Sequence, residues 1–234
     1  MKESSFLSSR VSTSEEHNLD KSRYRDVIPG ESTRVKLQPD DADDDNNDFI
    51  NANYVTGYNN EEKAYIFTQG NARDLDGWPQ PRAPTHLSIH SLGPLQSTEK
   101  DFWRMIWQEN ISIIVMTTNL RESGMNKCYP YWPSKPKESL DLNPYQIVNE
   151  KSEAYDSFVV TTLILRKKNQ PSSRTIYHAH YLKWPDHGIP VGTRDALLFL
   201  EKVEGYKQLA KTKAPVLLHC SAGIGRTGDR KSVV

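Results

Sequence analysis

The sequence predicts one α/β domain, and three features carry this prediction. First, segments with the character of strands are interspersed along the 234-residue chain with segments that have the apolar period of helices. Second, "ISIIVMTT" (111–118) and "APVLLHC" (214–220) are short, continuously apolar runs, as expected of strands covered on both faces. Third, the later of these runs passes from strand to loop at a cysteine with distinctive neighbours.

Composition limits the class of protein. The chain is long enough to bury a substantial core as one domain or at most two. Its 30 basic and 30 acidic side chains cancel, so neither nucleic acid nor an anionic membrane is expected as a partner. No apolar segment is long enough for a membrane span or a secretion signal. Two cysteines are too few for a disulfide framework or a zinc cage, and we expect a cytoplasmic protein with reduced thiols.

The first half of the chain is predicted to form a loose tail followed by short strands. Residues 1–19 are polar and serine-rich, which predicts a flexible tail ahead of a domain over 20–234. A charged loop then passes into a short strand. The segments "FINANYV" (49–55) and "KAYIFT" (63–68) are predicted to be strands on either side of a polar turn.

Two helices are predicted. The segment "STEKDFWRMIWQEN" (97–110) can be capped by Ser97 or Thr98 and has acidic residues in its first turn. The side chains that follow its helical period are Phe102, Met105, Ile106 and Glu109. Residues 193–211 are predicted to form a second, amphipathic helix.

Longer strands are predicted between these two helices. They are "FVVTTLILRKK" (158–168) and "TIYHAHYLKW" (175–184), and "NQPSS" is the turn that joins them. The strand over 214–220 follows the second helix and delivers Cys220 to a loop.

Two segments fit neither a strand nor a helix. The acidic run over 40–48 is interpreted as a solvated loop, since no glutamate or glycine falls at the positions that a calcium-binding loop requires. Residues 71–93 contain three prolines and have no sustained period. Because a structureless connection of this length is uncommon inside a compact domain, we interpret it as a surface insertion.

The segment "HCSAGIGRTG" (219–228) holds the residues with the most specific chemistry. The mostly small residues between Cys220 and Arg226 let the backbone curl so that successive amide hydrogens point into one anion-binding hollow. These residues are Ser221, Ala222, Gly223, Ile224 and Gly225. The Arg226 guanidinium can hold two phosphate oxygens at once. Such positive surroundings favour the thiolate form of a cysteine, and a thiolate beneath a bound phosphate is a nucleophile aimed at phosphorus.

Both cysteines also have a structural interpretation. Most free cysteines are buried core residues, but two glycines and an arginine at this spacing make that interpretation poor for Cys220. Cys128, in "NKCYPYW", has no such neighbours, and we interpret it as structural.

The segment "HCSAGIGRTG" resembles the phosphate-binding signature of the protein tyrosine phosphatases, a cysteine followed after five residues by an arginine. The resemblance extends along the chain in the expected order. "KSRYRD" resembles the phosphotyrosine-recognition loop, and "WPDHGIP" resembles the mobile loop that bears the acid. Further similar landmarks are "DFINANYV", "TQG" with "DFWRMIW", and "KCYPYWP". The chain is most similar in these motifs to the classical, non-receptor branch of the family.

The resemblance implies a fold, a substrate class and a reaction. The fold is a highly twisted mixed β-sheet flanked by helices, and the partners are proteins that contain phosphotyrosine. Cys220 attacks phosphorus to form a cysteinyl-phosphate, while Arg226 and the loop amides hold the equatorial oxygens. Asp186 protonates the departing tyrosine oxygen and later takes a proton from water. Thr227 helps the sulfur to leave, and His219 tunes the thiolate through backbone contacts. Neither a cofactor nor a metal ion is implied.

The resemblance also assigns residues to substrate binding and support. Tyr24 stacks on the substrate ring and sets the depth of the pocket, which excludes phosphoserine, and Asp26 holds backbone amides of the substrate. Trp184 anchors the hinge of the acid-bearing loop, Glu122 braces the signature arginine, and Lys127 braces the closed loop. Taken alone, the aromatic residues fit simple packing, the aspartates fit turns, and Glu122 and Lys127 fit exposed surface charges.

Two departures from the family pattern are expected to matter. A long helix and a later glutamine-bearing loop follow "GRTG" in the family, whereas six residues, "DRKSVV", follow it here. Deleting 71–93 joins "TQG" to "PLQSTEKDFW", which reads as an uninterrupted family sequence. We therefore hypothesise an alternative gene product with a retained segment and an early stop. His187 stands where an aromatic residue is frequent.

A catalytically impaired phosphotyrosine binder, or an inert fragment, is the alternative to an active enzyme.

Overall fold

The fold was analysed in a computed structural model of the chain. The structure describes residues 18, 21–22, 29–39, 47–57, 60–68, 94–122, 124–185 and 193–220. The proposed tail over 1–19 lies outside these residues except for position 18, and the proposed insertion over 71–93 lies wholly outside them. The domain boundaries therefore stay predictions.

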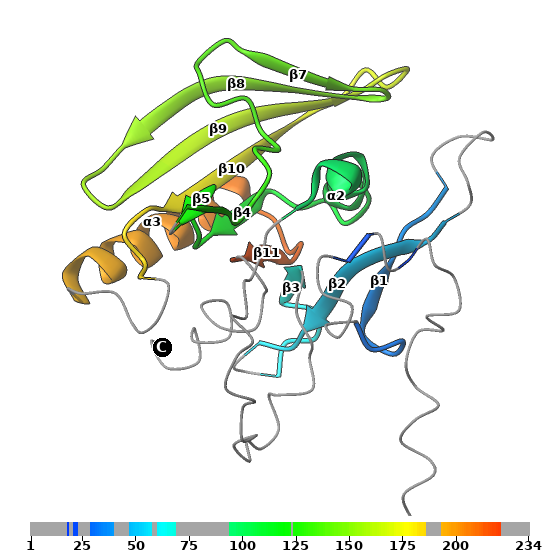
Figure 1. The fold of residues 1–234 in the computed structure, drawn as a ribbon, viewed down its shortest axis with the longest axis horizontal. Coiled ribbons are helices and arrows are strands. Elements are labelled where there is room, and N and C mark those ends of the chain that lie inside the picture. Colours follow the sequence, from blue (N-terminus) through cyan, green and yellow to red (C-terminus); the bar gives the residue numbers. More distant parts are fainter. Residues whose placement is uncertain are drawn as a thin grey trace, which may run out of the picture.

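A nine-stranded mixed sheet forms the body of the described structure, with two helices beside it (Figure 1). Its strands are β1 (Arg34–Lys36), β2 (Phe49–Val55), β3 (Tyr65–Thr68), β4 (Ile113–Met116), β7 (Ser139–Leu142), β8 (Tyr145–Ala154), β9 (Phe158–Lys167), β10 (Ser173–Tyr181) and β11 (Val216–His219). The other elements are the 3₁₀ helix η3 (Gln96–Thr98), the helices α2 (Glu99–Gln108) and α3 (Thr193–Ala210), and a hairpin of β5 (Arg121–Glu122) and β6 (Met125–Asn126).

The sheet has a parallel centre and antiparallel flanks. The strand order is β1-β2-β3-β11-β4-β10-β9-β8-β7. Strand β11 is parallel to both of its neighbours, β3 and β4, and β4 is parallel to β10. The remaining pairs in this sheet are antiparallel. This arrangement confirms the predicted mixed sheet, and it brings the carboxyl ends of β3, β11 and β4 to the same edge.

The two faces of strands β11 and β4 pack into two different hydrophobic clusters. Leu217 of β11 and Ile114 of β4 belong to the cluster that α2 covers. Leu218 and Val115, the next residues of the same strands, belong to the cluster that includes residues of α3. Successive side chains of a strand point to opposite faces of its sheet. The continuous apolar runs predicted for these strands therefore supply both clusters at once.

Helix α2 packs as predicted but begins differently. Phe102, Met105 and Ile106 are all buried in the cluster beneath it, whereas Glu109 is the residue at which the helix ends rather than a member of its apolar face. The Thr98 hydroxyl donates to the Leu95 carbonyl oxygen at 3.4 Å and accepts from the Leu95 amide at 3.0 Å. It therefore closes the preceding 3₁₀ turn, and no side-chain cap forms at the start of α2.

Helix α3 is less amphipathic than predicted. Phe199 and Val203 are its buried residues, and they pack with Phe158 and Tyr181 of the sheet. Three large apolar residues of α3 are exposed to solvent: Leu197, Leu198 and Leu209.

Strands β7 and β8 were not predicted from the sequence. Only the first half of β8 alternates between buried and half-buried positions, and the second half is almost entirely exposed. A register shift between Asn149 and Lys151 interrupts its pairing with β9. Backbone hydrogen bonds to β9, and not the burial of side chains, stabilise the polar half of β8. This half therefore has no apolar pattern. Pairing of this kind leaves no periodic signal in the sequence.

Candidate active site

Strand β11 carries Cys220 to the carboxyl edge of the parallel strands. Its residues Leu217 and Leu218 lie opposite Ile114 and Val115 of β4. The Thr117 amide donates to the His219 carbonyl oxygen at 3.0 Å, which extends this pairing beyond the end of β4. Cys220 follows directly and is 1% exposed. Backbone hydrogen bonds to both neighbouring strands therefore fix the approach to the predicted nucleophile.

The His219 ring contacts the backbone of Cys220 and is fully buried. Its Nδ1 is 3.0 Å from the Cys220 carbonyl oxygen, and its Nε2 is 2.6 Å from the Tyr131 hydroxyl. Burial, together with the nearby His180 ring, lowers the pKa of His219 to about 4, although its bond to the Cys220 carbonyl acts in the opposite direction. The ring is therefore neutral at pH 7.

Tyr131 joins His219 to a second buried histidine, His178. The Tyr131 hydroxyl is 2.8 Å from His178 Nε2. Burial raises the pKa of Tyr131 well above its usual value and lowers the pKa of His178 well below it. The Phe102 ring packs against Tyr131 with ring centroids 4.7 Å apart. Aromatic rings thus enclose a small polar network behind Cys220.

Tyr131 and His178 were not predicted as site residues from the sequence. Tyr131 lies within "KCYPYW", and His178 lies in the predicted strand "TIYHAHYLKW". The one sign in the sequence is that His178 stands two residues after Ile176, on the same face of a predicted strand, and both are buried on β10. This pattern does not identify Tyr131 as the hydrogen-bond partner of His178, because 47 residues separate the two in the chain.

The hairpin of β5 and β6 presents Glu122 and leads into Lys127. Glu122 Oε1 accepts hydrogen bonds from the Asn119 amide at 3.1 Å and the Thr118 hydroxyl at 3.3 Å, so its carboxylate ties the hairpin to the end of β4. Lys127 is 1% exposed, and its backbone amide donates to the Leu120 carbonyl oxygen at 2.8 Å. The interpretation of Lys127 as an ordinary exposed charge is therefore wrong. Lysine is almost never fully buried without a compensating contact.

Trp184 packs on the other face of the sheet. It lies against the cluster that includes residues of α3, and its ring meets the Tyr181 ring edge to face at 5.9 Å between centroids. The neighbouring strand β10 is tied to β4 at this edge, since the Asn119 side chain donates to the Leu182 carbonyl oxygen at 3.0 Å.

The remaining predicted site residues lie outside the described residues. They are Tyr24, Asp26, Asp186, Ser221, Ala222, Gly223, Ile224, Gly225, Arg226 and Thr227. Of the predicted set, the described structure joins the His219 ring to the Cys220 carbonyl oxygen. It holds Glu122 on the hairpin that follows β4 and Lys127 directly after that hairpin.

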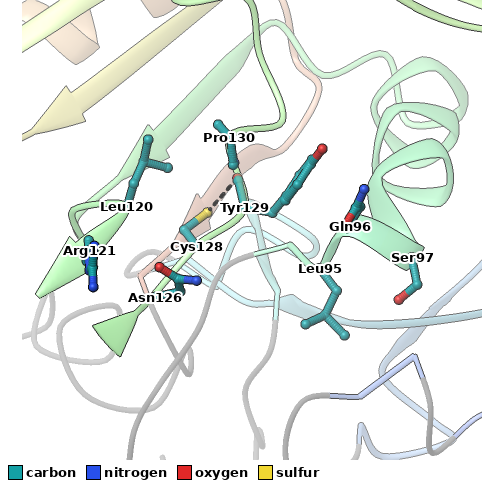
Figure 2. Close-up of a pocket in the computed structure, with 9 residues that line it drawn as sticks. All are labelled: Leu95, Gln96, Ser97, Leu120, Arg121, Asn126, Cys128, Tyr129 and Pro130. Atoms are coloured by element: carbon teal, nitrogen blue, oxygen red, sulfur yellow. Dashed lines mark hydrogen bonds between the residues drawn. The ribbon is translucent and has the colours of Figure 1, made fainter. Parts of the chain in front are cut away.

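A cavity of about 840 Å³ opens beside Cys128 (Figure 2). Its lining comes from residues 95–97 ahead of α2, from Leu120 and the β5–β6 hairpin that follows it, and from residues 128–130. The Cys128 thiol donates to the Tyr129 carbonyl oxygen at 3.2 Å, the bond drawn dashed in Figure 2. Cys128 is 3% exposed and packs in the cluster beneath α2, which confirms that it is a core residue. None of the described residues predicted to act in catalysis lines this cavity.

The described residues offer neither a metal site nor a membrane-spanning helix. Within them, no cluster of three or more histidine, cysteine, aspartate or glutamate side chains could hold a metal ion. None of the helices in the described part of the chain has the length and apolar character that crossing a membrane requires.

Comparison with known proteins identifies relatives over nearly the whole chain. The family profile described as "Protein-tyrosine phosphatase" matches residues 18–230. Receptor-type tyrosine-protein phosphatase zeta of Homo sapiens is 37% identical over 220 residues, which cover 90% of this chain and 8% of that protein. Tyrosine-protein phosphatase non-receptor type 12 of Homo sapiens is 36% identical over 213 residues, which cover 91% of this chain and 24% of that protein.

A third relative, tyrosine-protein phosphatase non-receptor type 7 of Homo sapiens, is 36% identical over 89% of this chain and 49% of its own length. The chain thus spans less than half the length of each of these relatives. The family match includes every strand and helix of the described structure, together with the segment over 219–228. The mixed sheet, the position of Cys220 at the end of its strand β11 and this match lead to one conclusion: the chain belongs to the protein-tyrosine phosphatase family.

Proposed function

We propose that this chain is a protein tyrosine phosphatase that releases phosphate from phosphotyrosine in proteins through a cysteinyl-phosphate intermediate. The observation that supports this most strongly is the placement of Cys220. Cys220 lies at the carboxyl edge of parallel strands and is the first residue of a Cys-x5-Arg segment. The chain that holds it belongs to the tyrosine phosphatase family. Ligands of open α/β sheets bind at this edge.

In the first step, the Cys220 sulfur attacks the phosphorus atom. A sulfur–phosphorus bond forms while the bond from phosphorus to the tyrosine oxygen breaks. Asp186 donates its proton to that oxygen, since a phenolate is a poor leaving group unless it is protonated. Arg226 and the amides of residues 221–225 bind the equatorial oxygens, whose negative charge is spread in the transition state.

In the second step, water attacks the phosphorus of the cysteinyl-phosphate. The Asp186 carboxylate takes a proton from this water, the sulfur–phosphorus bond breaks, and inorganic phosphate leaves. The Thr227 hydroxyl donates a hydrogen bond to the departing sulfur, which stabilises the returning thiolate. Neither step uses a cofactor or a metal ion.

Substrate selection is proposed to depend on the recognition segment "KSRYRD". Tyr24 stacks on the phosphotyrosine ring and makes the pocket too deep for phosphoserine to reach Cys220. Asp26 accepts hydrogen bonds from backbone amides of the substrate. Three described residues have supporting roles: Trp184 anchors the hinge of the acid-bearing loop, Glu122 braces Arg226, and Lys127 braces the closed loop.

A phosphotyrosyl peptide and the Cys220→Ser variant test this function. The wild-type chain is expected to release phosphate well above the rate of the variant, because serine is a far weaker nucleophile at neutral pH. Peptide binding is measured in parallel, together with the circular dichroism of both chains. Equal release with peptide still bound would identify a phosphotyrosine binder, and neither release nor binding would identify an inert fragment.

A further inference from the structure

Three buried side chains from three separate segments form a continuous hydrogen-bonded chain that ends at the backbone of Cys220. His178 lies on β10, Tyr131 follows the β5–β6 hairpin, and His219 ends β11. The Tyr131 hydroxyl is 2.8 Å from His178 Nε2 and 2.6 Å from His219 Nε2, and His219 Nδ1 is 3.0 Å from the Cys220 carbonyl oxygen. All three side chains are at most 1% exposed.

The position of each proton in this chain follows from the Cys220 carbonyl. A carbonyl oxygen only accepts, so His219 carries its proton on Nδ1. The neutral His219 ring then has a bare Nε2, which accepts the single proton of the Tyr131 hydroxyl. The Tyr131 oxygen is left as an acceptor, so His178 must donate to it from a protonated Nε2. All three bonds therefore run in one direction, from His178 to the Cys220 carbonyl.

The surroundings of His178 agree with this direction. The Nδ1 atom of His178 is buried and has no hydrogen-bond partner within the described part of the chain. No described acceptor therefore favours a proton on Nδ1 over a proton on Nε2. Its ring lies against the Trp132 ring with centroids 4.4 Å apart and an angle of 31° between the planes. The neighbouring His180 takes no part, because its Nε2 contacts the Thr118 carbonyl oxygen at 2.7 Å.

We propose that Tyr131 and His178 are positioning residues, which fix the His219 ring in the state that holds the Cys220 carbonyl and thereby orient the first peptide group of the nucleophile loop. This role rests on the proposed function, since it assumes that Cys220 is the nucleophile. A peptide group is planar and almost always trans, so its N–H points opposite to its C=O. Holding the Cys220 carbonyl therefore sets the plane of the peptide group with which the nucleophile loop begins.

Nitrogen NMR of the histidine side chains tests the hydrogen-bonded chain without any need for catalysis. The full chain is labelled with ¹⁵N-histidine, and the rings are assigned with the His178→Gln and His219→Gln variants. At pH 7 we expect His219 to be protonated only on Nδ1 and His178 only on Nε2. A His178 ring protonated on Nδ1, or a charged ring at either position, would overturn the proposal.

Matched variants then test the positioning role. His178→Leu removes the donor, whereas His178→Gln keeps an amide donor at the place of Nε2. Tyr131→Phe removes the hydroxyl and keeps the ring. Loss of one buried hydrogen bond of this kind lowers a rate or an affinity by about tenfold. We expect His178→Leu and Tyr131→Phe to lower kcat by about this factor with little change in KM, and His178→Gln to restore most of it.

The affinity for inorganic phosphate gives a second readout of the loop, with Tyr145→Phe as a control for the loss of another buried tyrosine hydroxyl. Should His178→Leu not fold, Tyr131→Phe and His178→Gln decide the matter. Equal phosphate affinity and kcat in these variants and wild type, with the expected ring protonation, would refute the positioning role alone. The expected protonation in a wild-type chain that neither binds phosphate nor hydrolyses phosphotyrosine would refute the proposed function and, with it, the positioning role.

Discussion

Trp103 donates its indole N–H to the backbone carbonyl oxygen of Tyr131 at 2.9 Å, and both residues are fully buried. This single bond ties helix α2 to the segment that carries Tyr131 toward His219. The indole also packs beside the Phe102 ring at 6.2 Å between centroids. Helix α2 therefore supports the region behind Cys220 without contributing a predicted catalytic residue.

Replacing Trp103 with phenylalanine is expected to lower the free energy of unfolding by about 2–4 kcal/mol, because the change leaves a cavity and an unpaired buried carbonyl. Urea denaturation monitored by circular dichroism measures the change. Trp107→Phe makes the same substitution at the more exposed end of α2, where Trp107 is 8% exposed, and is expected to cost less. Equal losses at the two positions would show that the bond to Tyr131 adds nothing to stability.

The buried His219 ring predicts how stability depends on pH. Burial lowers its pKa from 6.5 to about 4 in the folded chain, so between these values the unfolded chain binds more protons than the folded chain. Stability is therefore lost as the pH falls through this window and is retained above it. This contribution amounts to about 2 kcal/mol between pH 7 and pH 5.

Urea denaturation of wild type and His219→Gln at both pH values isolates this contribution. The fall in the free energy of unfolding from pH 7 to pH 5 is expected to be about 2 kcal/mol smaller in the variant. Identical falls in the two chains would mean that the ring does not stay neutral in the folded state.

Helix α3 is attached at its first turn by a bond between side chains. The Ser157 hydroxyl, ahead of β9, donates to the Asp195 carboxylate in that turn. Ser157→Ala leaves the carboxylate without this donor and is expected to lower the free energy of unfolding by about 1–3 kcal/mol, as for other hydrogen bonds to charged groups. Ser172→Ala, at an exposed position between β9 and β10, is the control and is expected to change stability by less than about 0.5 kcal/mol. A similar effect of both variants on urea denaturation would contradict this attachment.

The acid role proposed for Asp186 predicts a dependence on the leaving group. Asp186→Asn is expected to lower kcat by about 10²–10⁴-fold for phosphotyrosine, the range typical of general acid catalysis. The loss is expected to shrink for aryl phosphates whose phenols are more acidic, because their oxygens leave without a proton. Steady-state kinetics over a series of such phosphates measures the trend. The same loss across the series would remove Asp186 from the acid role.

The positions and types of the apolar elements could be predicted from the sequence. Helix α2 was predicted within two residues at each end, because burial imposes a period of 3.6 on the side chains of a helix. Strand β2 was predicted over all of its residues from its place beside a polar turn. The nucleophile segment was equally accessible, since a cysteine, small residues and an arginine at fixed local spacing carry their chemistry in the order of the chain. Strand β8 escaped prediction because backbone pairing holds its polar half.

The amino-acid sequence by itself determined the family, the apolar strands around Cys220 and the local order of Cys220 and Arg226, because each is carried by motifs whose own residues are close together in the chain. Tertiary structure alone decided that Lys127 is buried and that the rings of His178, Tyr131 and His219 share one hydrogen-bonded chain. Tyr131 and His219 lie 88 residues apart, and the pairing of β11, β4 and β10 in one sheet brings His178 and His219 to the same tyrosine. Contacts of this kind arise from strand order and register, which no local spacing encodes.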